Sequence, residues 1–197
     1  MKKGYGFTLL FMLIVSAVFS ALLAGANVFA RDSIEANQAL DLQRNLLYAL
    51  NVPNDGTAAG IRQVYSDNVT DAPFADRTVP AKKAEDGSIA GYAFPFKGPG
   101  LWGTIEGYLG IAADGKTLTG IVFTAHSETP GLGGRIDEDW FKEQFRGLAV
   151  PASGAMSLKD AGGAGDIDAI TGATFTSRSV LSLVNGTLEK NALKGGD

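Results

Sequence analysis

Cysteine is absent from the 197 residues, and histidine occurs once, as His126. The chain therefore has no disulfide, no thiolate nucleophile and no cysteine-ligated iron–sulfur cluster. A metal site or catalytic triad that needs several histidines is excluded as well. Lysine and arginine number 17 against 21 acidic residues, and the net charge is −4. With no basic stripe in the sequence, nucleic acid is not an expected partner.

Glycine, in contrast, is abundant, at 26 of 197 residues, where the usual share is about 7%. The length fits one domain of ordinary size with an N-terminal appendage. So many glycines are typical of a domain rich in turns, with a binding site built from loops.

Charged residues are also missing from a long N-terminal stretch, Gly4 to Ala30. About 20 apolar residues span a bilayer as a helix, so residues 1–30 are predicted to be a cytoplasmic stub and a single transmembrane anchor in lipid. The positive-inside tendency places Lys2 and Lys3 in the cytoplasm. The alternative is a signal peptide cleaved after Ala30, although its apolar region is usually only ~7–15 residues long. Both interpretations export the chain from residue 31 onward.

Two segments follow the anchor. Apolar residues at three- and four-residue steps predict a helical stalk over 31–52, which Pro53 closes. Residues 53–197 are predicted to be the main domain, facing the periplasm or the outside of the cytoplasmic (inner) membrane. Within it, residues 57–90 are expected to contain one short helix near Gly60–Tyr65, followed by loop.

The rest of the domain reads as α+β, an antiparallel sheet packed by helices. Alternating apolar residues predict a strand from Ile89 to about residue 97 and further strands over 104–112 and 116–125. The Asp114-Gly115 pair predicts a hairpin turn between the last two. The remaining expected elements are a helix over 138–145 with Trp140, Phe141 and Phe145 buried, a turn over 161–165, a short strand over 166–170, and a last helix from 175 or 176 to about 190.

A threonine-rich turn precedes this last helix, in the sequence Asp-Ala-Ile-Thr-Gly-Ala-Thr over 168–174. Backbone amides and the dipole at a helix N-terminus favour a phosphate group. Gly172 permits a close backbone approach, and the hydroxyls of Thr171, Thr174, Thr176 and Ser177 add donors. The residues alone also fit an ordinary threonine or serine N-cap.

Two glycine-rich loops carry further polar and aromatic groups. Glu-Thr-Pro-Gly-Leu-Gly-Gly over 128–134 is stiffened by Pro130 and exposes backbone groups that suit the polar edge of a ring system. Gly-Pro-Gly-Leu-Trp-Gly-Thr over 98–104 places Leu101 and Trp102 where they can cover a flat ligand. The simpler interpretations are a tight Pro-Gly turn and a core tryptophan.

Together the three motifs resemble the FMN-binding subunits of two related membrane complexes. These are the C subunit of the Na⁺-translocating NADH:quinone reductase and the G subunit of the Rnf electron-transport complex. The 168–174 motif resembles their covalent flavinylation site, and the 128–134 loop resembles the loop beside their flavin. The stretch 98–104, with its tryptophan, resembles the corresponding stretch of the quinone-reductase subunit. The shortness of the 54–90 region, in contrast, resembles the Rnf subunit. Both complexes therefore stay open.

The resemblance implies covalent FMN, joined to Thr174 by a phosphoester, with Thr176 as the second candidate. It implies an electron carrier that works with other membrane redox subunits of an ion-translocating, sodium-transporting or related, oxidoreductase. It also implies a flavinyl transferase, dependent on FAD and Mg²⁺, for maturation. No catalytic or metal-ligating residue is expected. The implied cofactor-binding residues are Thr171, Gly172, Ala173, Thr174, Thr176, Ser177, Glu128, Thr129, Gly131, Leu132, Gly133, Leu101 and Trp102.

Three charged or titratable residues near these motifs have two interpretations each. His126 either donates to the flavin or is structural. Asp168 serves either the FMN itself or else transferase recognition or the end of a strand. Arg178 either neutralises the phosphate or is solvated. Two other functions are also compatible with the sequence: a free-standing exported reductase with covalent FMN, and an exported non-redox binding domain whose threonine turn is only a helix cap.

Overall fold

The computed structural model describes residues 4–151, 154–159, 163 and 165–191. The chain divides into two compact units, one up to Asp41 and one from Leu42. The expected turn over 161–165 lies largely outside the described residues, as do Lys2 and Lys3.

The first unit is the greater part of helix α1 (Tyr5–Ala49). Its N-terminal part is apolar and long enough to cross a membrane, and its large apolar side chains are exposed rather than packed inside the protein. Helix formation here needs no special cap, because nearly the whole segment consists of residues compatible with a helix and contains no proline.

The last turns of α1 belong to the second unit, where Leu46, Leu47 and Ala49 are buried. The helix ends at Ala49, and Asn51 follows with a left-handed φ of 51°, a conformation common just after a helix C-terminus. The hydroxyl of Thr119 donates a hydrogen bond to the carbonyl oxygen of Ala49 at 2.6 Å. The helix end is therefore fixed on the sheet described next.

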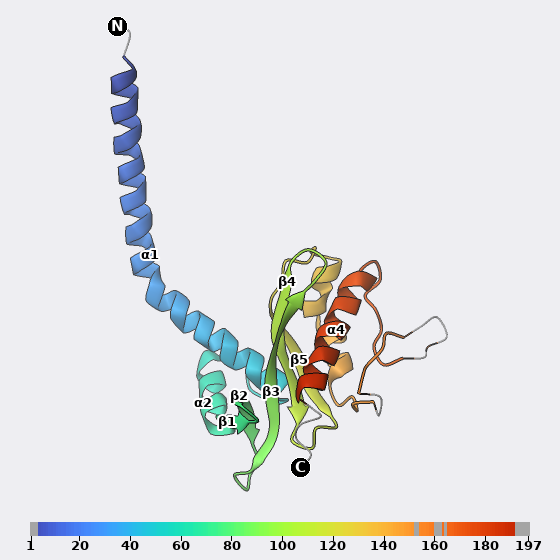
Figure 1. Ribbon diagram of the computed structural model, residues 1–197. Helices are drawn as coiled ribbons and strands as arrows, with labels where there is room; N and C mark the ends of the chain where they lie inside the picture. Colours follow the sequence, from blue (N-terminus) through green and yellow to red (C-terminus); the bar gives the residue numbers. More distant parts are fainter. Residues whose placement is uncertain (1–3, 152–153, 160–162, 164, 192–197) are drawn as a thin grey trace. The chain divides into compact units, whose positions relative to one another are not determined.

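The second unit is built on a five-stranded antiparallel sheet in the order β1-β2-β3-β4-β5, in which each strand pairs with its neighbours in sequence (Figure 1). The α+β prediction is confirmed. The strands are β1 (Val69–Phe74), β2 (Arg77–Lys83), β3 (Ile89–Pro99), β4 (Thr104–Ala112) and β5 (Leu118–Ala125).

The prediction that a loop occupies most of residues 57–90 is wrong. Helix α2 (Ala58–Asn68) is longer than predicted, and β1 and β2 form a hairpin after it. The hairpin has weak sequence signals, since Pro73 and Pro80 interrupt its strands and Ala75, with φ of 53°, takes a turn position usually given to glycine or asparagine.

Three helical pieces follow β5: η1 (Gly133–Asp137), α3 (Asp139–Lys142) and η2 (Glu143–Phe145). Phe141 and Phe145 are buried as predicted, but Trp140 is 40% exposed. A four-residue helix between 3₁₀ turns does not keep the 3.6-residue spacing on which that prediction rested. Instead, the Trp140 ring lies 5.3 Å from the Arg135 guanidinium.

Helix α4 (Thr174–Asn191) closes the domain and packs on β3 and β4 (Figure 1). The strand expected over 166–170 is wrong, because only Ile167 forms a bridge, to Leu158. The side chain of Gln144 takes the place of a neighbouring strand: its carbonyl oxygen accepts from the Asp168 amide at 2.7 Å, and its amide donates to the Asp168 carbonyl at 3.4 Å. The core lies between the sheet, α4 and the η1–η2 region, and its members include Phe94, Phe141, Phe145, Ile105, Leu109 and Val184.

Candidate functional site

The threonine turn leads directly into α4. The Ala173 amide donates to the Ile170 carbonyl at 2.9 Å, and Gly172 has φ of 78°, the arrangement of a type II turn with glycine at its third position. Thr174 is the first residue of the helix and is exposed. An 18-residue helix therefore presents its positive end and an accessible hydroxyl at the same point.

The next two hydroxyls are buried and engaged in hydrogen bonds. Thr176 donates to the Glu128 carboxylate at 2.6 Å. The Ser177 oxygen accepts from the Ile170 amide at 3.0 Å and donates to the Ala173 carbonyl at 3.1 Å. These side chains hold the turn in shape, which leaves Thr171 and Thr174 as the exposed hydroxyls of the motif.

The 128–134 loop forms a second tight turn. The Thr129 carbonyl accepts from the amides of Leu132, at 3.1 Å, and Gly134, at 2.9 Å. Pro130 and Gly131, with φ of 74° at Gly131, occupy the two central positions, as a type II turn prefers. This turn projects Leu132, which is 45% exposed, towards the first motif: a Cβ on Gly172 would lie 3.2 Å from Leu132 Cδ2.

The Glu128 carboxylate joins all three motifs. It is 5% exposed. Its Oε1 accepts from the amides of Leu101, at 2.8 Å, and Trp102, at 3.0 Å, while Oε2 accepts from Thr176. The Leu101–Trp102 turn and the first turn of α4 are therefore held on either side of one carboxylate, although they lie far apart in the sequence.

Large apolar side chains stand exposed around this point. Leu101 is 51% and Trp102 69% exposed. Phe175, beside Thr174, is 69% exposed and was missed as a site residue, because in the sequence it reads only as the start of a helix. Together with Leu132 they are the exposed large apolar side chains of the three motifs, which Glu128 and the approach of Leu132 to Gly172 bring together. Exposed apolar groups gathered in this way mark binding sites.

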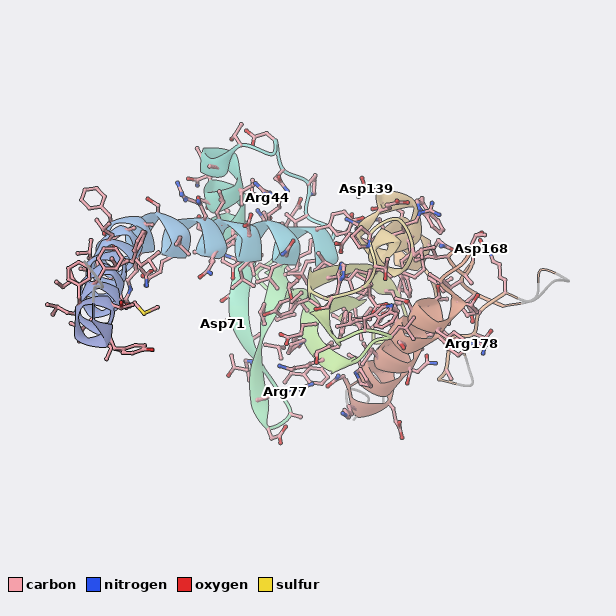
Figure 2. All side chains as sticks on the ribbon, turned by 90° about the horizontal axis from the view of Figure 1, so that it is seen from above. Arg44, Asp71, Arg77, Asp139, Asp168 and Arg178 are labelled. Atoms are coloured by element: carbon pink, nitrogen blue, oxygen red, sulfur yellow. The ribbon has the colours of Figure 1, made fainter. Side chains whose placement is uncertain are left out.

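The three charged or titratable residues are placed as follows. His126 is mostly buried, and its Nε2 lies 2.8 Å from the Asp137 carboxylate while Nδ1 accepts from the Glu128 amide. Asp168 pairs with Lys159 at 2.8 Å. Figure 2 shows Asp168 on the segment before α4 and Arg178 on α4 itself, where it lines a groove with Met156 and Leu181.

Comparison with known proteins explains this combination. A sequence model of the FMN-binding domain family matches residues 100–189, which includes the three motifs from Gly100 on. The G subunit of an ion-translocating oxidoreductase complex from Methanosarcina acetivorans is 32% identical over 90% of this chain and 89% of its own length. The chain belongs to the family of these FMN-binding subunits. The C subunit of the Na⁺-translocating NADH-quinone reductase from Neisseria meningitidis serogroup A, in the same family, is 30% identical over 91% of this chain and 88% of that protein.

Solved structures from this family share the fold. The crystal structure of NqrC from Shewanella oneidensis matches with a TM-score of 0.64 at 23% identity, over 75% of this chain and 90% of that one. The C subunit of the Na⁺-translocating NADH-quinone reductase from Parabacteroides distasonis matches with a TM-score of 0.68 at 24% identity, over 85% and 97% respectively.

Proposed function

We propose that this chain is an electron-carrier subunit of a membrane-bound ion-translocating oxidoreductase complex, of the NADH-quinone reductase or Rnf type, with FMN joined by a phosphoester to Thr174. Family membership supports the cofactor. The observation that carries the attachment site is the contrast within α4: Thr174 is exposed at the first helical position, whereas the hydroxyls of Thr176 and Ser177 are buried and bonded.

The residues around Thr174 fit an FMN. A phosphate on the Thr174 oxygen lies at the positive end of α4, where negative charge is favoured. The exposed faces of Leu101, Trp102, Leu132 and Phe175 suit the flat, largely apolar ring system. Backbone groups of the 128–134 turn suit its polar edge. Bound there, FMN supplies reversible electron transfer, and the protein contributes binding, orientation and electrostatics.

Attachment requires a separate flavinyl transferase with FAD and Mg²⁺. The Thr174 oxygen forms a bond to the phosphorus on the FMN side of FAD, the bond to the adenylate oxygen breaks, and AMP leaves. The threonine proton passes to a base of the transferase. The exposure of Thr174 allows the enzyme to reach it, and the bonds that Ser177 makes to Ile170 and Ala173 hold the turn in one conformation.

The remaining redox subunits of the complex are the proposed electron donor and acceptor. The apolar part of α1 is the proposed single anchor in the inner membrane. The positive-inside tendency then places the flavin domain on the periplasmic or outer side.

The test is co-expression of the full chain with and without a flavinyl transferase, followed by fluorescence on a denaturing gel and intact-mass measurement. We expect a fluorescent band and the mass of one FMN in the wild type and in Thr176→Val, only with the transferase. We expect neither in Thr174→Ala. A wild-type chain that stays colourless with active transferase contradicts the proposal, and so does a Thr174→Ala chain that becomes fluorescent.

A further inference from the structure

The Glu128 carboxylate is a buried charge whose partners are all neutral. It accepts two backbone amides and one hydroxyl, at 2.6–3.0 Å. No ion pair joins it to a lysine, arginine or histidine in the part of the chain that the structure describes. Buried carboxylates are usually compensated by a cation. Here the carboxylate is stabilised by neutral donors alone. Such donors keep the negative charge in place but do not neutralise it.

Two glycines lie directly against the carboxylate. A Cβ on Gly100 would lie 2.5 Å from Oε1 of Glu128, and a Cβ on Gly133 would lie 2.6 Å from Oε2. Neither position has room for a side chain, so the backbones of the 98–104 and 128–134 loops enclose the carboxylate. It is also tied to α4 through Thr176, two residues after the proposed attachment point.

We propose that Glu128 tunes the cofactor, and that its fixed negative charge lowers the reduction potential of FMN on Thr174. This inference rests on the proposed function. Electrons that arrive on the ring system bring negative charge, and a like charge nearby makes their arrival less favourable. Because the carboxylate is buried, dissolved salt screens it much less than it screens a surface charge. The three neutral donors make the charge tolerable without cancelling it.

The test compares Glu128→Gln with the wild type as full-length, flavin-loaded protein in detergent. Glutamine keeps the size of the side chain, and its carbonyl oxygen still accepts from the amides of Leu101 and Trp102, while its amide can donate to the Thr176 oxygen. The matched control is Glu189→Gln, the same loss of charge at an exposed position near the end of α4. Each midpoint potential is measured by spectroelectrochemical titration at low and at high salt.

We expect a higher potential in Glu128→Gln at both salt concentrations and an unchanged potential in Glu189→Gln. A Glu128→Gln potential equal to that of the wild type overturns the inference, and so does a shift that disappears at high salt. Should Glu128→Gln fail to fold or to take up flavin, Thr176→Val decides, because it keeps the charge and removes one donor. Its potential is expected to fall, and a constant or raised potential overturns the inference. A wild type that carries no flavin contradicts the proposed function itself, which separates the two failures.

Discussion

At the scale of single residues, the site depends on glycines at positions where a side chain would not fit. A Cβ at Gly133 would lie 2.6 Å from Oε2 of Glu128 and 2.6 Å from the hydroxyl oxygen of Thr176, two atoms that are hydrogen-bonded to each other. Real Cβ atoms keep larger distances from their neighbours, so a side chain at position 133 would force these atoms to move. The glycines of this loop therefore serve packing around a carboxylate as well as turn geometry.

For Gly133→Ala we expect a loss of about 1–3 kcal/mol in the free energy of unfolding, because the methyl group forces Glu128 and Thr176 apart and leaves a buried charge short of a donor. Denaturant titration followed by tryptophan fluorescence measures this. The control is Gly186→Ala in α4, where a Cβ meets nothing within 4 Å and alanine favours the helix. Equal stability of Gly133→Ala and the wild type would contradict the close packing of Gly133 against Glu128 and Thr176.

The sequence predicted individual site residues only where they lie within one short motif. The hydroxyls and glycines of 168–177 and the loop at 128–134 were predicted from the residue types within each motif. The bonds of Glu128 to Leu101 and Thr176 were not, because they join residues 27 and 48 positions apart. A lone glutamate in the sequence gives no signal of such partners.

At the scale of elements, the end of α1 and the turn η2 meet at Tyr48. Its hydroxyl donates to Glu143, which also accepts from Arg146 at 2.6 Å. Both the Arg146 guanidinium and the Lys142 ammonium lie 4.6 Å from the Tyr48 ring centre. Burial, and next the bond to Glu143, raise the pKa of Tyr48 from 10.0 to about 12.

A raised pKa in the folded state means that the folded protein holds the Tyr48 proton more tightly than the unfolded chain does. The resulting stability is complete below pH 10 and is lost as the pH rises to about 12. We expect Tyr48→Phe to be less stable than the wild type at neutral pH, on the order of 1 kcal/mol for a partly exposed ring, and the two proteins to converge between these pH values. Denaturant titrations across that range measure it, and a constant difference would contradict the role of Tyr48.

The elements that sequence patterns predicted best are those with strong local signals. Strands β3 to β5 are rich in buried apolar residues, and Asp114-Gly115 forms the expected turn, with Gly115 at φ of 67°. Helix α4 carries its apolar side chains at helical spacing. Hairpin β1–β2 was missed because prolines and a left-handed alanine hide it. The segment 166–170 was wrongly predicted to be a strand. The side chain of Gln144 bonds the Asp168 backbone there, and sequence periodicity does not reveal such a partner.

At the scale of the whole molecule, α1 serves both units. The sequence placed the domain boundary at 52/53, whereas the compact second unit begins at Leu42. Leu46 and Leu47 are at most 1% exposed, so the last turns of the helix form part of the folded domain.

We therefore expect a fragment of residues 42–197 to fold in water and to accept FMN from the transferase. A fragment of residues 53–197 should lose on the order of 5 kcal/mol of unfolding free energy, because the buried Leu46, Leu47 and Leu50 are missing. This loss is comparable with the whole stability of many domains. Circular dichroism during thermal unfolding distinguishes the two. Equal melting temperatures would contradict this role for the end of α1.

The central claim is that Thr174 carries the flavin, and peptide mapping tests it most directly. Trypsin cleaves after Lys159 and Arg178, so the peptide 160–178 holds every candidate hydroxyl of the motif. Fragmentation of this peptide from wild-type protein made with the transferase should place the FMN mass on Thr174 alone. An unmodified peptide, or FMN on Thr171, Thr176 or Ser177, would contradict the account.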